Sequence, residues 1–105
     1  MIVVVFRNRL NPEVPQEEYT KRAEEIYELG SKMPGFTSIK SFTADDGEVA
    51  VIVEFDNEEN LAAWRNHPEH LVAQQQGRDR FYTEYTLQIC QEVRKSEFDQ
   101  SSSPA

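Results

Sequence analysis

The only tryptophan and the only two histidines of this chain, Trp64, His67 and His70, lie in one seven-residue stretch, WRNHPEH. Histidine accepts or donates a proton near neutral pH, and tryptophan packs its large ring against apolar or flat groups. Together they suit a pocket that holds an aromatic molecule and removes a proton from it. We take His70 and His67 as candidate catalytic bases and Trp64 as a substrate-binding wall. The competing interpretation is structural: Trp64 packs in the core, and His67, which precedes a proline, caps the next helix.

Helical spacing extends this candidate site toward the C-terminus. His70, Gln74, Gly77 and Phe81 follow one another at i, i+4, i+7 and i+11, which places them on one face of a helix. If that face lies against the sheet, Gln74 and Phe81 join the substrate-binding residues. If it lies against water, the stripe has no role.

Asn8 is a further candidate substrate-binding residue, on the strand face that carries Val4 and Phe6. An amide among apolar neighbours must find hydrogen-bond partners or lower the stability of the fold. Two interpretations remain open: a bond to a nearby loop, or a pocket amide that holds a substrate oxygen.

Other chemistries have little support. The stretch HPEH lacks the i, i+4 histidine pair of a zinc-binding HExxH helix, so we expect no metal. There is no glycine-rich phosphate loop for a nucleotide cofactor. Cys90 alternates with Thr86 and Gln88 and is expected to be a small strand filler.

Bulk properties narrow the class of protein. The 105 residues suit one domain, and a net charge of −8 disfavours nucleic acid as a partner. A single cysteine favours the reducing cytoplasm. The apolar opening Met1–Phe6 is too short to span a membrane. We therefore expect a cytoplasmic protein with no membrane partner.

The elements are expected in the order β-α-β-β-α-β, a ferredoxin-like α+β fold with a four-stranded antiparallel sheet and helices on one face. The Asp-Gly turn at 45–47 predicts a hairpin, and the spacing of Asp56 and Glu59 resembles a helix-capping box. Residues 1–95 form the domain, and residues 96–105 form a polar, disordered tail. The expected ranges are strands at 2–10, 36–44, 48–55 and 83–94, and helices at 16–33, 57–66 and 68–82.

Apolar residues occupy both faces of two of these strands. Val3 and Val5 point away from Ile2, Val4 and Phe6, and the strand at 48–55 has the same two-sided pattern. Strands that are apolar on both faces need both faces buried. Because the helices cover one face only, we expect a homodimer that covers the other.

Three short motifs add a resemblance to a known family. The chain has MPGF before its second strand, WxxHPxH running into AQxxGR, and FYxxY at the start of its last strand. In these motifs and in element order it resembles the antibiotic-biosynthesis monooxygenase domain family, over roughly residues 1–94. The resemblance implies a dimeric α+β barrel with a pocket between sheet and helices in each subunit.

The resemblance also implies two kinds of activity. Some members oxygenate aromatic polyketides or quinols without metal, flavin or heme, whereas a second branch binds and degrades heme. The second branch is similar to this chain at Asn8 and Trp64, but the position of its heme-ligating histidine is Gln74 here.

We therefore expect a cofactor-independent monooxygenase that oxidises a small planar aromatic substrate, a quinol or polyketide-like molecule, with O2. The alternatives are a heme-binding or heme-degrading protein, with heme as the cofactor, and a non-enzymatic dimeric module that binds a small ligand or serves in stress responses.

Overall fold

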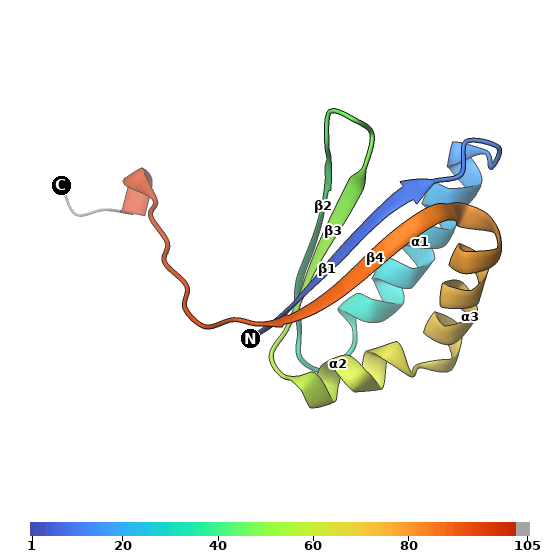
Figure 1. Cartoon of the computed structure of the whole chain (residues 1–105). Helices are drawn as coiled ribbons and strands as arrows, with labels where there is room; N and C mark the ends of the chain where they lie inside the picture. The colour runs from blue at the N-terminus through green and yellow to red at the C-terminus, as the bar shows by residue number, and fades with distance from the viewer. Residues whose placement is uncertain (103–105) are drawn as a thin grey trace.

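The computed structural model describes residues 1–102. Strand β1 (Ile2–Leu10) lies between β3 and β4 in a four-stranded antiparallel sheet with the order β2-β3-β1-β4 (Figure 1). The other strands are β2 (Phe36–Thr43), β3 (Val49–Phe55) and β4 (Tyr82–Gln91). Val4 lies opposite Val53 on one side and Ile89 on the other. The ferredoxin-like fold expected from the sequence is confirmed.

The hairpin between β2 and β3 turns at Gly47, whose φ of 92° is open to glycine and rarely to other residues. The Asp46 carboxylate accepts a hydrogen bond from the Glu48 backbone N–H at 3.0 Å, which closes the turn. The Asp-Gly turn thus forms the predicted hairpin.

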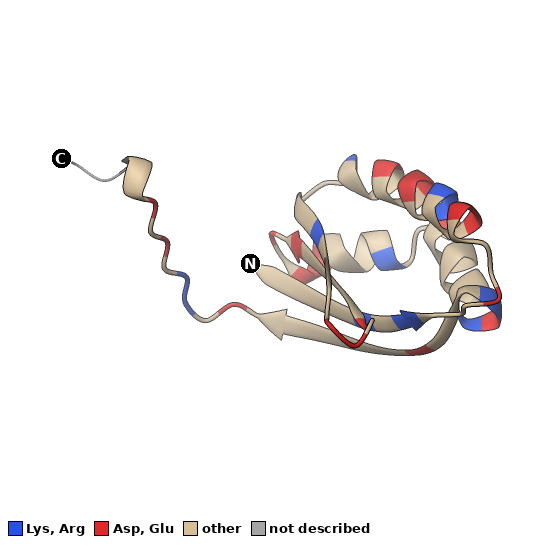
Figure 2. Cartoon of the chain, turned by 90° about the horizontal axis from the view of Figure 1, so that it is seen from above, with Lys and Arg blue, Asp and Glu red and all other residues tan. Residues whose placement is uncertain are grey.

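Three α-helices cover one face of the sheet: α1 (Gln16–Ser31), α2 (Glu58–Arg65) and α3 (Pro68–Gln76) (Figure 1). Acidic and basic residues alternate along α1, which lies over the sheet (Figure 2). The expected helix at 68–82 was too long, because a short π-helix, η1 (Gly77–Phe81), follows α3. The cap of α2 is Asn57, which accepts from the Asn60 N–H, so the expected cap at Asp56 was wrong.

The core lies between this sheet face and the helices. It is built from the buried side chains of Ile2, Val4, Phe55, Leu61 and Trp64. Gly30 lets the Trp64 ring approach the α1 backbone, since a Cβ there would lie 3.0 Å from Trp64 Cζ2.

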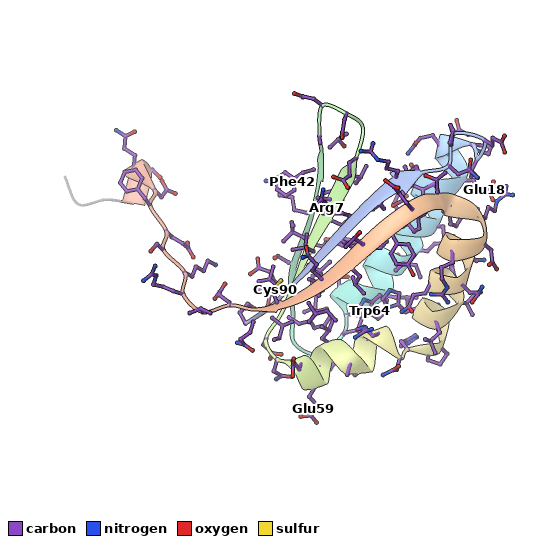
Figure 3. The ribbon with its side chains drawn as sticks, in the orientation of Figure 1. Arg7, Glu18, Phe42, Glu59, Trp64 and Cys90 are labelled. Atoms are coloured by element: carbon purple, nitrogen blue, oxygen red, sulfur yellow. The ribbon has the colours of Figure 1, made fainter. Side chains whose placement is uncertain are left out.

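The other sheet face has no covering element among the described residues. Val5 pairs with Ile52 and Gln88 there, and all are at least partly exposed. Phe42, 51% exposed, projects from β2 on the side away from the helices (Figure 3). Cys90 is exposed opposite Val3, so it does not fill a core position in the single chain as expected.

Beyond β4 the chain leaves the domain as an extended arm that ends in η2 (Gln100–Ser102) (Figure 1). The Val93 side chain is 95% exposed and that of Phe98 is 84% exposed. Residues 103–105 of the expected disordered tail lie outside the described residues. Within residues 1–102, no helix is long and apolar enough to cross a membrane.

Gly30→Val should lower the free energy of unfolding by about 1–3 kcal/mol, because the added atoms overlap the Trp64 ring. Urea denaturation followed by far-ultraviolet circular dichroism measures the change. The control is Ala63→Val at an exposed position of α2, which isolates the small helix-propensity cost of valine. Equal losses in both variants would contradict the close packing of Gly30 and Trp64.

Candidate active site

A cavity of about 820 Å³ lies between the helix-facing side of the sheet and the helices. Its floor includes Phe6 from β1, Val51 from β3 and Leu87 from β4. Trp64, His70, Gln74 and Phe81 line the helical side. A largely apolar space with a few polar groups is the usual form of a small-molecule site.

Trp64 lies in the space enclosed by α1, α2 and the sheet (Figure 3). Its side chain is 7% exposed, and its ring contacts the Gly30 position of α1. The same residue belongs to the core and to the cavity wall, so the structural and the functional interpretations of Trp64 are compatible.

His70 stacks on Trp64, with ring centroids 4.1 Å apart and planes inclined by 17°. Its Nδ1 lies 3.1 Å from the Trp64 backbone oxygen. A carbonyl oxygen only accepts hydrogen bonds, so the neutral ring must carry its proton on Nδ1 to make this bond, leaving the Nε2 lone pair as the basic site. Burial lowers the pKa of His70 below its ordinary value of 6.5, and the bond to Trp64 offsets part of that shift.

His67 has a different place. It is the N-cap of α3, where its Nδ1 accepts a hydrogen bond from the Glu69 N–H at 3.2 Å, directly before Pro68 at the first helical position. His67 is not among the residues that line the cavity, although its ring lies 5.8 Å from that of Trp64. The structure therefore separates the two histidines, with His70 on the cavity wall and His67 at a helix cap.

The stripe of His70, Gln74, Gly77 and Phe81 faces the interior. Gln74 donates from Nε2 to the Arg65 backbone oxygen at 3.1 Å, which holds its amide at the cavity wall. Gly77 lies against the Tyr82 ring, where a Cβ would come within 2.7 Å of it.

Asn8 is 1% exposed on the helix-facing side of β1, opposite Val49 and Tyr85. Neither Oδ1 nor Nδ2 has a hydrogen-bond partner among the described residues. Asn8 is not one of the cavity-lining residues, so it does not border the cavity with Trp64, His70 and Gln74 as expected. The predicted bond to a nearby loop is also missing. A buried amide without partners costs about 1–3 kcal/mol.

Two candidate functional residues, Tyr19 and Tyr82, were not predicted from the sequence. The hydroxyl groups of Tyr19 and Tyr82 lie 3.4 Å apart, and both residues line the cavity. Burial raises the pKa of the Tyr82 phenol far above its ordinary value of 10, so this group stays protonated and able to donate. Their separation of 63 positions in the chain hides the pair from any local pattern.

The described residues contain no group of three or more His, Cys, Asp or Glu side chains that could hold a metal ion. The polar side chains at the cavity instead include one imidazole, two amides, four phenols and three guanidinium groups.

Comparison with known proteins places this geometry in a family. The family model described as antibiotic biosynthesis monooxygenase matches residues 1–76. The chain belongs to this family. YqjZ of Bacillus subtilis, an uncharacterised relative, is 27% identical over 84 residues, which cover 80% of this chain and 74% of YqjZ.

Solved structures of antibiotic biosynthesis monooxygenases share the fold. A protein of Deinococcus radiodurans described as a putative member superposes with a TM-score of 0.80 at 10% identity, covering 94% of this chain and 99% of its own. SnoaB of Streptomyces nogalater, described as a cofactor-independent oxygenase, superposes with a TM-score of 0.74 at 12% identity, covering 90% of this chain and 94% of its own.

Asn8→Leu should raise the free energy of unfolding by about 1–3 kcal/mol, because a side chain of similar size replaces an amide without partners. Thermal and urea unfolding measure this change. Asn60→Leu is the control, since the Asn60 amide donates to Asp56 at 2.8 Å and its loss should destabilise the protein. Destabilisation by Asn8→Leu would show that the Asn8 amide has a partner in the folded protein.

Proposed function

We propose that this protein is a cofactor-independent monooxygenase that oxidises a small planar aromatic substrate, a quinol or a polyketide-like molecule, with O2. One observation carries the proposal: a half-buried imidazole, His70, lies against Trp64 on the wall of a largely apolar cavity. Membership of the monooxygenase family and the fold shared with SnoaB support it.

In this proposal His70 Nε2 is the general base. It takes a proton from a phenolic O–H or from an activated ring CH2, with the substrate ring held beside Trp64 and Phe81. The resulting anion passes an electron to O2, and the oxygen species then combines with the substrate radical. For a ring CH2, the net change is CH2 + O2 → C=O + H2O, so the substrate supplies all the electrons.

The polar groups around the cavity have positioning roles in this mechanism. Gln74 and the Tyr19–Tyr82 pair donate hydrogen bonds to substrate oxygens, and such bonds stabilise charge that develops during the reaction. Asn8 has no role in this mechanism, because it is buried and does not line the cavity. The apolar walls exclude water from the reacting anion.

Heme binding is the second candidate, and His70 is the observation that favours it, because its Nε2 is the imidazole nitrogen at the cavity wall free of protein bonds. Gln74, by contrast, donates its amide to Arg65 and is a poor iron ligand. Titration with hemin separates the candidates. A shifted Soret band that disappears in His70→Ala would favour heme over the oxygenase.

His70→Ala should reduce oxygen uptake with a reactive anthrone or quinol by about 100-fold or more, the usual contribution of a general base. The control is His67→Ala, which removes a helix cap at a cost of about 1 kcal/mol but leaves the cavity base in place. Both variants are measured with an oxygen electrode at saturating substrate. Equal loss of activity in both would contradict the assignment of His70.

The pH dependence gives an independent test. Because burial lowers the pKa of His70 below its ordinary value of 6.5, kcat/KM should fall at a more acidic pH than a free imidazole would give. The same shift makes the unfolded chain bind more protons than the folded one below pH 6.5. Stability should therefore decline as pH falls through that range, and His70→Ala should lose this decline.

We also propose a homodimer formed by the uncovered sheet face. Val5→Asp places a carboxylate at its centre and should dissociate or unfold the dimer, at a cost of several kcal/mol. The matched control is Val72→Asp, on the exposed side of α3, where Val72 is 54% exposed. Sedimentation velocity at micromolar concentration measures the oligomeric state. A monomeric parent protein, or a Val5→Asp dimer, would contradict the proposed interface.

A further inference from the structure

Positive charge gathers around the cavity of a chain that is acidic overall. The chain has 19 Asp and Glu residues against 11 Lys and Arg residues, for a net charge of −8. The cavity wall nevertheless includes Arg22, Arg65 and Arg78, and Glu24 is its one acidic residue. Lys40 also borders the cavity, but its Nζ lies 5.5 Å from the Phe42 ring centroid, away from the helices.

Two of these arginines have no carboxylate partner. Arg22 pairs with Glu25 at 3.0 Å, and Arg7, Arg9 and Arg80 also form ion pairs elsewhere on the surface. Arg65 and Arg78 form no ion pair with any residue in 1–102, although acidic side chains outnumber basic ones. Arg78 donates only to the neutral Gln75 side chain, at 2.9 Å.

Both arginines lie close in the chain to the proposed catalytic groups. Arg65 directly follows Trp64, and its backbone oxygen accepts the Gln74 amide. Its charge is close enough to His70 to contribute to the lowered pKa of that imidazole, after burial and His67. Arg78 lies four residues beyond Gln74, which itself lies four beyond His70, and all three line the cavity. Base, amide and guanidinium thus follow one another along the same wall.

We infer that the substrate is an aromatic acid, whose ring lies in the cavity that Trp64 lines and whose carboxylate binds at Arg65 or Arg78. The inference rests on the proposed function and names its substrate class. Guanidinium groups bind carboxylates through paired hydrogen bonds, and a rim arginine without a protein partner keeps its donors available. The same two charges favour the substrate anion that forms when His70 takes a proton.

Binding of two matched probes tests this inference without turnover. The probes are 1-hydroxy-2-naphthoate and 1-naphthol, which differ by the carboxylate. Calorimetric titration gives their affinities, and quenching of the fluorescence of Trp64, the only tryptophan, shows that each occupies the cavity. We expect the naphthoate to bind about tenfold more tightly at low salt, with the preference shrinking as ionic strength rises from about 0.01 M to about 1 M.

Substitutions of the two arginines test whether they cause the preference for the carboxylated probe. Arg65→Gln and Arg78→Gln should each reduce it by about threefold, and the double variant should bind both probes equally. The control is Lys32→Gln, which removes the same charge from an exposed ion pair with Glu28 outside the cavity and should leave the preference intact. Because both arginines are exposed, the variants should fold, as circular dichroism can verify.

The outcomes separate this inference from the proposed function. Equal affinities in the parent protein, or a preference that persists in the double variant, overturn carboxylate selection even if oxygen uptake is observed. A preference that depends on Arg65 and Arg78, with no oxygen uptake from carboxylated quinols, supports the aromatic acid and overturns the oxygenase alone. Failure of both probes to quench Trp64 overturns the aromatic-acid inference, whereas the oxygenase is tested separately by oxygen uptake.

Discussion

The Trp64 indole packs where α1, α2 and α3 meet, and this contact organises the rest of the helical layer. On one side the missing side chain of Gly30 lets the ring approach α1, and on the other His70 stacks on it. The Trp64 backbone oxygen also accepts from His70, so one residue fixes both the plane and the tautomer of the imidazole. Packing and protonation state at the cavity therefore depend on the same few atoms.

The parts of the fold that follow from local pattern were predictable. Continuous apolar runs define β1 and β3, and the Asp-Gly turn defines the hairpin between β2 and β3. The spacing from His70 to Phe81 also predicted that these residues share one helix face. Local pattern could not supply the direction in which that face points, because it depends on how α3 packs on the sheet.

Features set by tertiary contacts were missed. The Tyr19–Tyr82 pair joins the start of α1 to the start of β4, and the Asn8 amide has no hydrogen-bond partner among the described residues. The cap of α2 is one residue later than expected, at Asn57, which has the extended backbone that a cap needs and accepts from the Asn60 N–H. The π-helix was missed because its sequence, GRDRF, has no strong signal against an ordinary helix.

The π-helix has a consequence for how this family can change in length. It joins α3 directly to β4, with no loop between them, and Tyr85, Leu87 and Ile89 of β4 then face the cavity on alternate residues. Deleting one residue from Gly77–Phe81 would slip β4 by one position and turn those side chains to the opposite face. Insertions and deletions should therefore accumulate in the β2–β3 turn and the C-terminal arm, and homologues should keep the length of this junction constant.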